Sequence, residues 1–250
     1  MSSEISENFI KISLWFENCS SIIKSVTKIH FDWKGGIFME NKYTKIFTTG
    51  TNAALKVTPG HFATNHAHIN YYLDMTTLKT RTSEAQQVAK SLGGMYLYDT
   101  IVDTIVCMEG TEVIGAFMSE ELTNSGFHSM NMHQTIYVVH PEFNNNSQII
   151  FRENLIPMIR NKHVIILMAT ITTGRSVNKA IESIQYYGGL LQGVSAIFSA
   201  VDQVNNIPIR SVFGKRDVPD YAYYDYRSCP LCKAGKELDA LVNAFGYSVL

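Results

Sequence analysis

The sequence predicts an α/β fold with a Rossmann-like, mostly parallel β-sheet flanked by helices. Its strand candidates are continuous apolar runs, of which His163 to Met168 (HVIILM) is the most apolar, and such runs are typical of strands buried on both faces. Between them lie segments whose apolar residues recur at spacings of three and four, as in amphipathic helices. Of the 250 residues, 46% are hydrophobic and 17% are charged, which indicates a globular chain with low surface charge.

The elements of this core alternate between helix and strand from Ser83 onward. A helix opens at Ser83 and ends at Gly93-Gly94, because adjacent glycines stop helices. A polar, turn-rich loop from Pro141 to Ser147 is expected to leave the core. The remaining elements are predicted as a strand at Asp103–Cys107, a helix at Glu112–Asn124, strands at Thr135–Val139 and His163–Met168, a helix at about Arg175–Tyr187, a strand at Val194–Phe198 and a final helix at about Lys236–Phe245.

Four segments are expected along the chain. Residues 39–80 lack the alternation and are predicted to form a small N-terminal hood lobe, residues 81–228 form the core, and residues 229–250 form a tail with a C-x-x-C motif and a helix. Residues 1–38 are an N-terminal extension with two open interpretations. Their apolar residues step by three and four, as in an amphipathic helix, but a purine run encoding Lys34-Gly35-Gly36 would also resemble a bacterial ribosome-binding site, with translation starting at Met39.

Charge and apolar patterning exclude several classes of protein. Lys plus Arg (21) and Asp plus Glu (22) nearly cancel to a net charge of -1, so no nucleic-acid or membrane partner is expected. Glu4 and Glu7 stand where a secretory leader needs positive charge. We therefore expect a cytoplasmic protein, and reduced thiols, because four cysteines are too few for a disulfide scaffold at this length.

The strongest local motif runs from His163 to Val177 (HVIILMATITTGRSV): an apolar strand, a turn rich in hydroxyl groups, and a helix. The free N–H groups at a helix N-terminus and the helix dipole attract anions, and a glycine lets the backbone approach a phosphate closely. The alternative is a turn whose hydroxyls only cap the helix. The candidate phosphate-binding residues are Thr170, Thr172, Thr173, Gly174, Arg175 and Ser176.

This motif resembles that of the type I phosphoribosyltransferases, in which an apolar strand is followed by two acids, two further residues and T-T-G-x-S/T. Four other stretches resemble the orotate phosphoribosyltransferases more narrowly, so that the similarity covers residues 46 to 236. The resemblance implies the phosphoribosyltransferase fold, a homodimer, a role in nucleotide metabolism and pyrimidine biosynthesis, and 5-phosphoribosyl 1-pyrophosphate (PRPP) with Mg²⁺ as ligands. The four stretches are Gly60-His61-Phe62, the segment from His68 to Asp74, Val201-Asp202, and Cys229 to Cys232 with Gly235.

The chain departs from the family pattern at positions that matter for chemistry. Met168 and Ala169 stand where the family has the acids that hold the ribose hydroxyls, and losing two charge-assisted hydrogen bonds costs roughly 3 to 6 kcal/mol. In the family the corresponding loop binds pyrophosphate, but here it brings two carboxylates toward a polyanion. The positions of that loop are Glu109, Gly110, Thr111 and Glu112, and the base-side candidates implied by the resemblance are His68, Tyr72 and Gln203.

Two functions therefore stay open. The first is an orotate-type phosphoribosyltransferase (a pentosyl-transferring glycosyltransferase) in which Glu109 or Glu112, with Mg²⁺, takes over from the missing acids. The second is a non-catalytic relative that senses or binds a nucleotide or sugar phosphate. Both bind a phosphorylated ribose at the turn from Thr170 to Ser176, and catalytic residues are not assigned.

The C-x-x-C motif is a candidate for metal binding, because Cys229 and Cys232 have the spacing of half a zinc site. No second C-x-x-C and no H-x-x-x-H is present, so the sequence favours a packed turn without metal, and His128 or His133, or a dimer axis, would have to complete a site. His61, His66 and His68 are expected either to hydrogen-bond a ligand or to lie in a solvated loop.

Overall fold

The computed structural model describes residues 43–250 except 125–128, 133 and 145–147. The predictions for residues 1–38, for His128 and for His133 lie outside these residues. The described residues belong to one compact unit, residues 42–250. Within them, no helix combines the length and the apolar character that crossing a bilayer requires.

A six-stranded sheet forms the core, in the order β10-β11-β9-β8-β4-β5; the last five strands are parallel to one another, and β10 is antiparallel to β11. Its central strands are buried along most of their length, in agreement with the apolar runs of the sequence. The mostly parallel α/β sheet is therefore confirmed. The strands are β4 (Thr104–Cys107), β5 (Tyr137–Val139), β8 (His163–Ile171), β9 (Leu190–Ser199), β10 (Gln203–Val204) and β11 (Ile207–Gly214).

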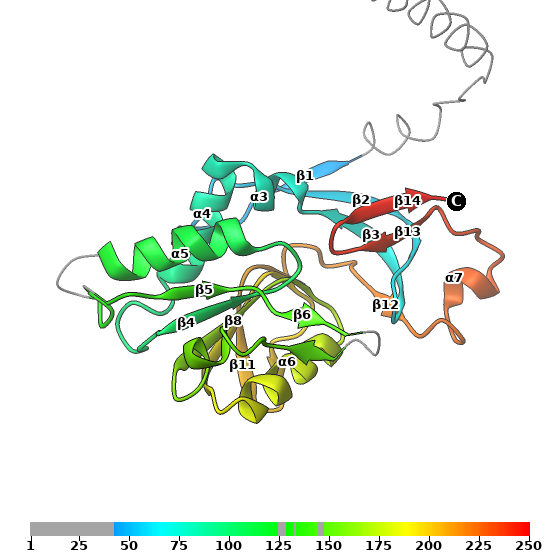
Figure 1. Cartoon of the computed structure of the whole chain (residues 1–250). Coiled ribbons are helices and arrows are strands. Elements are labelled where there is room, and N and C mark those ends of the chain that lie inside the picture. Colours follow the sequence, from blue (N-terminus) through cyan, green and yellow to red (C-terminus); the bar gives the residue numbers. More distant parts are fainter. Residues whose placement is uncertain (1–42, 125–128, 133, 145–147) are drawn as a thin grey trace, which may run out of the picture. The chain divides into compact units, whose positions relative to one another are not determined.

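Helices cover both faces of this sheet (Figure 1). On one side lie α4 (Thr82–Gly93) and α5 (Glu112–Asn124), and on the other lies α6 (Arg175–Tyr186), which buries Val177, Ala180, Ile181 and Ile184 in the core beside β8 and β9. A glycine lets α5 approach β4 closely, since a Cβ at Gly115 would lie 2.3 Å from the Cys107 sulfur. All three helices were predicted, each within one residue at both ends.

The connections reverse direction between β4 and β8. From β4 the chain runs through α5 to β5 on one side, and it later returns to β8 on the other side of β4 and continues to β9. In open parallel sheets such a reversal leaves a crevice at the carboxyl ends of the two strands, where ligands bind. Residues 108–111 and 172–174, which follow β4 and β8, therefore occupy the position where this architecture forms its sites.

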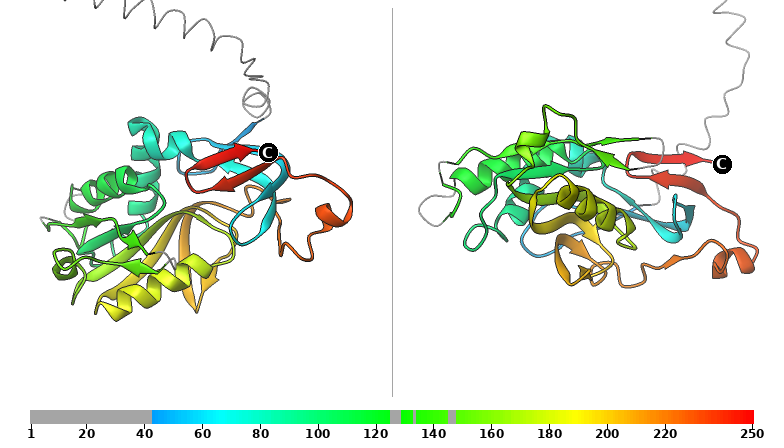
Figure 2. Two further views of the ribbon diagram at one scale, coloured as in Figure 1. Left: turned by 45° about the vertical axis from the view of Figure 1, so that its right-hand side comes forward. Right: turned by 60° about the horizontal axis from the view of Figure 1, so that its bottom comes forward.

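A second sheet, in the order β12-β3-β2-β13-β14 with β1 beside β2, forms the hood. The β2–β3 hairpin and the β13–β14 hairpin, far apart in sequence, lie side by side in every view (Figure 2). Two short helices, α3 and α7, and the 3₁₀ helix η2 lie between strands along the chain. The bounds of the remaining elements are β1 (Thr44–Ile46), β2 (Leu55–Ala63), β3 (His68–Asp74), α3 (Thr76–Thr80), β6 (Glu142–Phe143), β7 (Ile149–Ile150), η2 (Ile156–Met158), β12 (Tyr223–Tyr224), α7 (Pro230–Lys233), β13 (Ala240–Asn243) and β14 (Gly246–Val249).

The final helix predicted at Lys236–Phe245 is wrong, because residues 240–249 form the β13–β14 hairpin. Burial along β13 alternates residue by residue, with Ala240 and Val242 inside, which is the period of a strand. The Asn243 side chain accepts hydrogen bonds from the N–H groups of Phe245 and Gly246, so a local turn replaces the helix. The C-terminal strands consequently complete the hood sheet.

Candidate functional site

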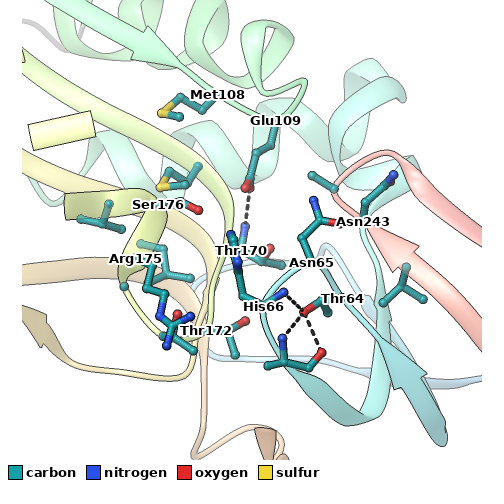
Figure 3. Close-up of a pocket in the computed structure, with 18 of the residues that line it drawn as sticks. Thr64, Asn65, His66, Met108, Glu109, Thr170, Thr172, Arg175, Ser176 and Asn243 are labelled. Atoms are coloured by element: carbon teal, nitrogen blue, oxygen red, sulfur yellow. Dashed lines mark hydrogen bonds between the residues drawn. The ribbon is translucent and has the colours of Figure 1, made fainter. Parts of the chain in front are cut away.

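A pocket of about 450 Å³ opens where β4 and β8 end, and the hood forms its far wall (Figure 3). Four segments supply most of its lining: the turn between β8 and α6, the loop after β4, and the tips of the two hood hairpins. All six residues predicted to bind phosphate line it: Thr170, Thr172, Thr173, Gly174, Arg175 and Ser176.

The β8–α6 turn supplies the donors. Gly174 is the N-cap of α6 with φ of +77°, and no side-chain hydrogen bond caps the start of this helix among the described residues. A Cβ at Gly174 would lie 2.6 Å from a methyl carbon of Val204, so only glycine fits both the backbone angle and the space. The positive end of the α6 dipole and the side chain of Arg175 thus face the pocket beside the hydroxyls of Thr172, Thr173 and Ser176.

The loop after β4 supplies a carboxylate. Glu109 adopts a left-handed φ of +61°, followed by Gly110 at +77°, and this turns the Glu109 side chain toward β8. Its Oε2 accepts hydrogen bonds from the backbone nitrogens of Ala169 and Thr170, each at 3.1 Å. Burial raises the pKa of Glu109, although these two hydrogen bonds and nearby Lys79 act in the opposite direction. A buried carboxyl group therefore lies close to the predicted phosphate turn.

Lys79 ties this loop to the hood. Its side chain is buried, and its ammonium donates to the carbonyl of Glu109 at 2.9 Å and to the carbonyl of Ala244 between β13 and β14. Burial lowers the pKa of Lys79, whereas Glu109, Glu112 and Asp74 act to raise it. Because both acceptors are backbone carbonyls, Lys79 fixes the distance between two walls of the pocket. Sequence reasoning did not single out this residue.

The hood wall is formed by the β2–β3 turn and the β13–β14 turn. Thr64 accepts hydrogen bonds from the nitrogens of His66 and Ala67, and its hydroxyl donates to the Ala67 carbonyl at 2.8 Å. Tyr72 also lines the pocket, and burial, together with Asp74 and Tyr247, raises its pKa, so its hydroxyl stays protonated. The hood turns therefore present amide and hydroxyl groups to the pocket.

Only some of the predicted pyrophosphate-loop and ribose-binding positions line the pocket. Of the pyrophosphate-loop positions only Glu109 lines the pocket. Thr111 is buried and donates to the carbonyls of Met108 and Leu167, and Glu112 pairs with His140 at 2.5 Å. Of the positions where the acids are missing, Met168 lines the pocket and Ala169 does not, although both are almost fully buried.

The base-side candidates do not gather at one place. Tyr72 faces the pocket, whereas Gln203 is exposed on the edge strand β10, where it pairs with Pro208. His68 does not line the pocket, although its neighbours Ala67 and Ile69 do, and it lies instead with His61, Cys229 and Cys232. Asp74 anchors a turn, accepting a hydrogen bond from the nitrogen of Thr76 at 2.9 Å.

The fold and the pocket together define an α/β protein with a glycine- and hydroxyl-rich turn at the reversal point of a parallel sheet. Part of the chain is similar to a known sequence. Over 71 residues, or 28% of this chain, it is 38% identical to the orotate phosphoribosyltransferase of Thermus thermophilus. That match spans 37% of the length of the Thermus protein. No protein-family model matches the chain.

Solved structures to which this chain is similar include orotate and other phosphoribosyltransferases. The orotate phosphoribosyltransferase of Mycobacterium tuberculosis in complex with inorganic phosphate has a TM-score of 0.43 and 16% identity, covering 60% of this chain and 81% of that chain. The same enzyme in complex with PRPP gives a TM-score of 0.43, 16% identity and coverages of 59% and 82%. Leishmania donovani UMP synthase gives a TM-score of 0.48 and 17% identity, covering 65% of this chain and 34% of that chain.

Proposed function

We propose that this protein is an orotate phosphoribosyltransferase-like member of the type I phosphoribosyltransferases that holds a phosphorylated ribose by its 5-phosphate at the turn from Thr170 to Ser176. One observation carries the proposal: all six residues predicted from the sequence motif line a single pocket at the carboxyl end of a parallel sheet. The similarity to the Thermus orotate phosphoribosyltransferase supports the same family.

The chemistry of the turn favours a phosphate monoester. The first N–H groups of α6 have no acceptors within the helix, and the dipole favours a dianion there. Threonine and serine hydroxyls add donors, and Arg175 adds a full positive charge with fork-shaped geometry. A ribose attached to this phosphate would extend toward the hood turns and Tyr72, which provide the hydrogen-bonding groups for a base.

PRPP fits less well than a monophosphate because its pyrophosphate would approach Glu109. Mg²⁺ is usually held by one or two carboxylates together with substrate phosphates, and Glu109 is the one carboxylate among the described lining residues. Met168 and Ala169 offer no oxygen ligands through their side chains. Glu109 is thus the residue that would contact a Mg²⁺–PRPP complex, and the missing diol acids make weak turnover the expected result.

The direct test is calorimetric titration with ribose 5-phosphate, nucleoside 5-monophosphates, orotate and PRPP, with and without Mg²⁺. We expect the monophosphates to bind at least as tightly as PRPP. If no phosphorylated ligand binds, the proposal fails. Tight PRPP binding with ready conversion of orotate would contradict the weak-turnover expectation and identify a working transferase of pyrimidine biosynthesis.

A second candidate function, a non-catalytic sensor of a nucleotide or sugar phosphate, is favoured by the two hydrogen bonds that hold Glu109 against β8. Monophosphate binding without turnover of orotate and PRPP would support it. For either function we expect a cytoplasmic homodimer, and light scattering tests the dimer directly: a monomer at micromolar concentration would contradict it.

A further inference from the structure

Two histidines of the hood and the two cysteines of the tail meet at one point. His61 lies near the end of β2, His68 begins β3, Cys229 is the N-cap of α7, and Cys232 lies within α7. One donor atom from each of the four side chains lies within 4.8 Å of all the others. His61 and Cys229 are buried, whereas His68 is half-buried and Cys232 is exposed.

The distances between these atoms match a tetrahedron around a metal ion. His61 Nε2 lies 3.1 Å from His68 Nδ1, 3.5 Å from the Cys229 sulfur and 3.6 Å from the Cys232 sulfur, and Cys232 lies 3.2 Å from His68 Nδ1. Zinc bonds of about 2.0–2.1 Å to nitrogen and about 2.3 Å to sulfur imply edges of roughly 3.3 Å between nitrogens and roughly 3.6 Å between nitrogen and sulfur. We propose that His61, His68, Cys229 and Cys232 bind a structural zinc ion.

The environment of His61 sets the tautomer that zinc requires. Its Nδ1 lies 2.9 Å from the carbonyl oxygen of Lys236 and 3.1 Å from that of Glu237. Carbonyl oxygens only accept hydrogen bonds, so Nδ1 carries the proton and Nε2 presents its lone pair to the cluster. Backbone carbonyls that orient a histidine through its other nitrogen are the usual second layer of a zinc site.

Hydrogen bonds alone satisfy the cluster poorly. The single lone pair of His61 Nε2 faces three groups, the nitrogen of His68 and the sulfurs of Cys229 and Cys232, and it accepts well from only one of them. A zinc ion accepts a lone pair from all four atoms at once. The N₂S₂ ligand set and the short distances favour zinc over Mg²⁺ or Ca²⁺, which prefer oxygen ligands.

All four ligands come from the protein, so the site is closed and structural rather than catalytic. The site joins the β2–β3 hairpin to the tail. Two hydrogen bonds beside it make the same connection: the backbone nitrogen of His61 donates to the carboxylate of Asp239 at 2.6 Å, and the backbone nitrogen of Asp239 donates to the His61 carbonyl at 2.8 Å. The same hairpin carries the turn at Thr64 to Ala67, and the tail carries Val242 to Phe245, both of which line the phosphate pocket. The ion therefore fastens two pocket walls that lie more than 160 residues apart, as the 168-residue separation of His61 and Cys229 shows.

The test is metal analysis of the full-length protein purified without chelators. We expect about one equivalent of zinc per chain, lost in Cys229→Ser, Cys232→Ser and His68→Ala. Matched controls are Cys107→Ala, a thiol buried on β4, and His66→Gln, an exposed histidine of the same hairpin. Both controls should keep the zinc. A zinc-free protein, a Cys229–Cys232 disulfide in place of the metal, or zinc retained by the cysteine variants would overturn the proposal.

A measurement on the unaltered protein keeps the proposal testable if the variants fail to fold. Protein in which Co²⁺ replaces zinc should show the visible bands of tetrahedral cobalt and a thiolate-to-cobalt charge-transfer band. Removing the metal with a chelator should lower the Tm by several degrees, because a structural zinc stabilises only the folded chain. Octahedral cobalt bands, or a Tm that does not change when bound metal is removed, would contradict a structural Cys₂His₂ site. These readouts do not depend on which phosphorylated ligand the pocket binds.

Discussion

The carboxylate of Glu109 lies 3.1 Å from the backbone nitrogen of Thr170, so a side chain from the loop after β4 reaches the beginning of the proposed phosphate turn. The contact gives the pocket opposite charges on its two sides, with Arg175 on the helix side and Glu109 on the loop side. A ligand with one phosphate can bind the turn without displacing Glu109. A ligand with an added pyrophosphate must neutralise or move it.

Glu109→Gln should therefore improve PRPP binding relative to ribose 5-phosphate by roughly tenfold, which corresponds to about 1.4 kcal/mol. Glutamine keeps an oxygen for the nitrogens of Ala169 and Thr170 and removes the charge. Calorimetry with both ligands measures the ratio. Glu112→Gln is the matched control, because Glu112 pairs with His140 and does not line the pocket. An unchanged ratio in Glu109→Gln would show that Glu109 does not oppose the pyrophosphate.

The pH dependence of PRPP binding tests the same charge. Burial raises the pKa of Glu109, so its carboxylate begins to take up a proton at a higher pH than an ordinary glutamate. The affinity for PRPP should then rise relative to the affinity for ribose 5-phosphate as the pH falls, and Glu109→Gln should remove this rise. Titration of the 5-phosphate itself occurs in both proteins and cancels in the comparison. A gain of equal size in the variant would assign the effect to another group.

Gly174→Ala should weaken the binding of every phosphorylated ligand by more than about tenfold, since the new Cβ would lie 2.6 Å from Val204 and the residue would keep a left-handed φ. Gly188→Ala is the control. It has a similar φ of +79°, but its Cβ would meet nothing closer than Arg160 at 3.5 Å, away from the pocket. Both variants should lose about 1 kcal/mol or more of stability, but only Gly174→Ala should lose binding in calorimetry. Equal binding by the two variants would contradict the proposed turn.

The sequence predicted the parallel core well because its strands and helices are determined locally. The apolar run that begins at His163 is long enough to require burial, and Gly174 marks the helix start through its own backbone angle. The tail was mispredicted for the opposite reason. The apolar residues from Ala240 to Phe245 satisfy helical spacing as well as strand alternation, and pairing with β14 and with the edge of β2 selects the strand.

The sequence predicted only one wall of the candidate site, the turn between β8 and α6. Residues of the phosphate turn are contiguous in the sequence, so their grouping was visible. The contact between Glu109 and Thr170 and the group of His61 with Cys229 join segments that no local pattern relates. The C-x-x-C motif was visible as half a zinc site, but the two histidines join it only in the folded chain, where β12 pairs with β3 and β13 pairs with β2.

Lys79→Met should lower the free energy of unfolding by about 1–3 kcal/mol, because it leaves the carbonyls of Glu109 and Ala244 without their shared donor. Methionine preserves most of the side-chain volume. Urea denaturation measures the change. Lys90→Met, an exposed lysine of α4, should stay within about 0.5 kcal/mol of the unaltered protein. Equal stability of the two variants would show that the buried ammonium does not hold the walls together.

The last prediction concerns the other end of the core sheet, where Asp103 joins the beginnings of β4 and β8. Its Oδ2 accepts hydrogen bonds from the backbone nitrogen and from Nδ1 of His163, both at 2.8 Å. Burial would raise the pKa of Asp103, but these hydrogen bonds outweigh burial and lower it. Asp103→Asn should therefore cost about 1–2 kcal/mol of stability at neutral pH.

The direction of the pKa shift determines the pH range in which the Asp103 carboxylate stabilises the fold. The pKa of Asp103 is lower in the folded chain than in the unfolded chain, so the charge stabilises the fold above the unfolded value of about 3.9. The stabilisation disappears as the pH falls through the lower, folded value. The stability difference between the unaltered protein and Asp103→Asn should thus be largest near neutral pH and shrink in acid, as measured by denaturation at a series of pH values. Asp220→Asn, at an exposed position, should show no such change. A difference for Asp103→Asn that stays constant into acid would mean that the shape of the side chain, and not its charge, holds β4 and β8 together.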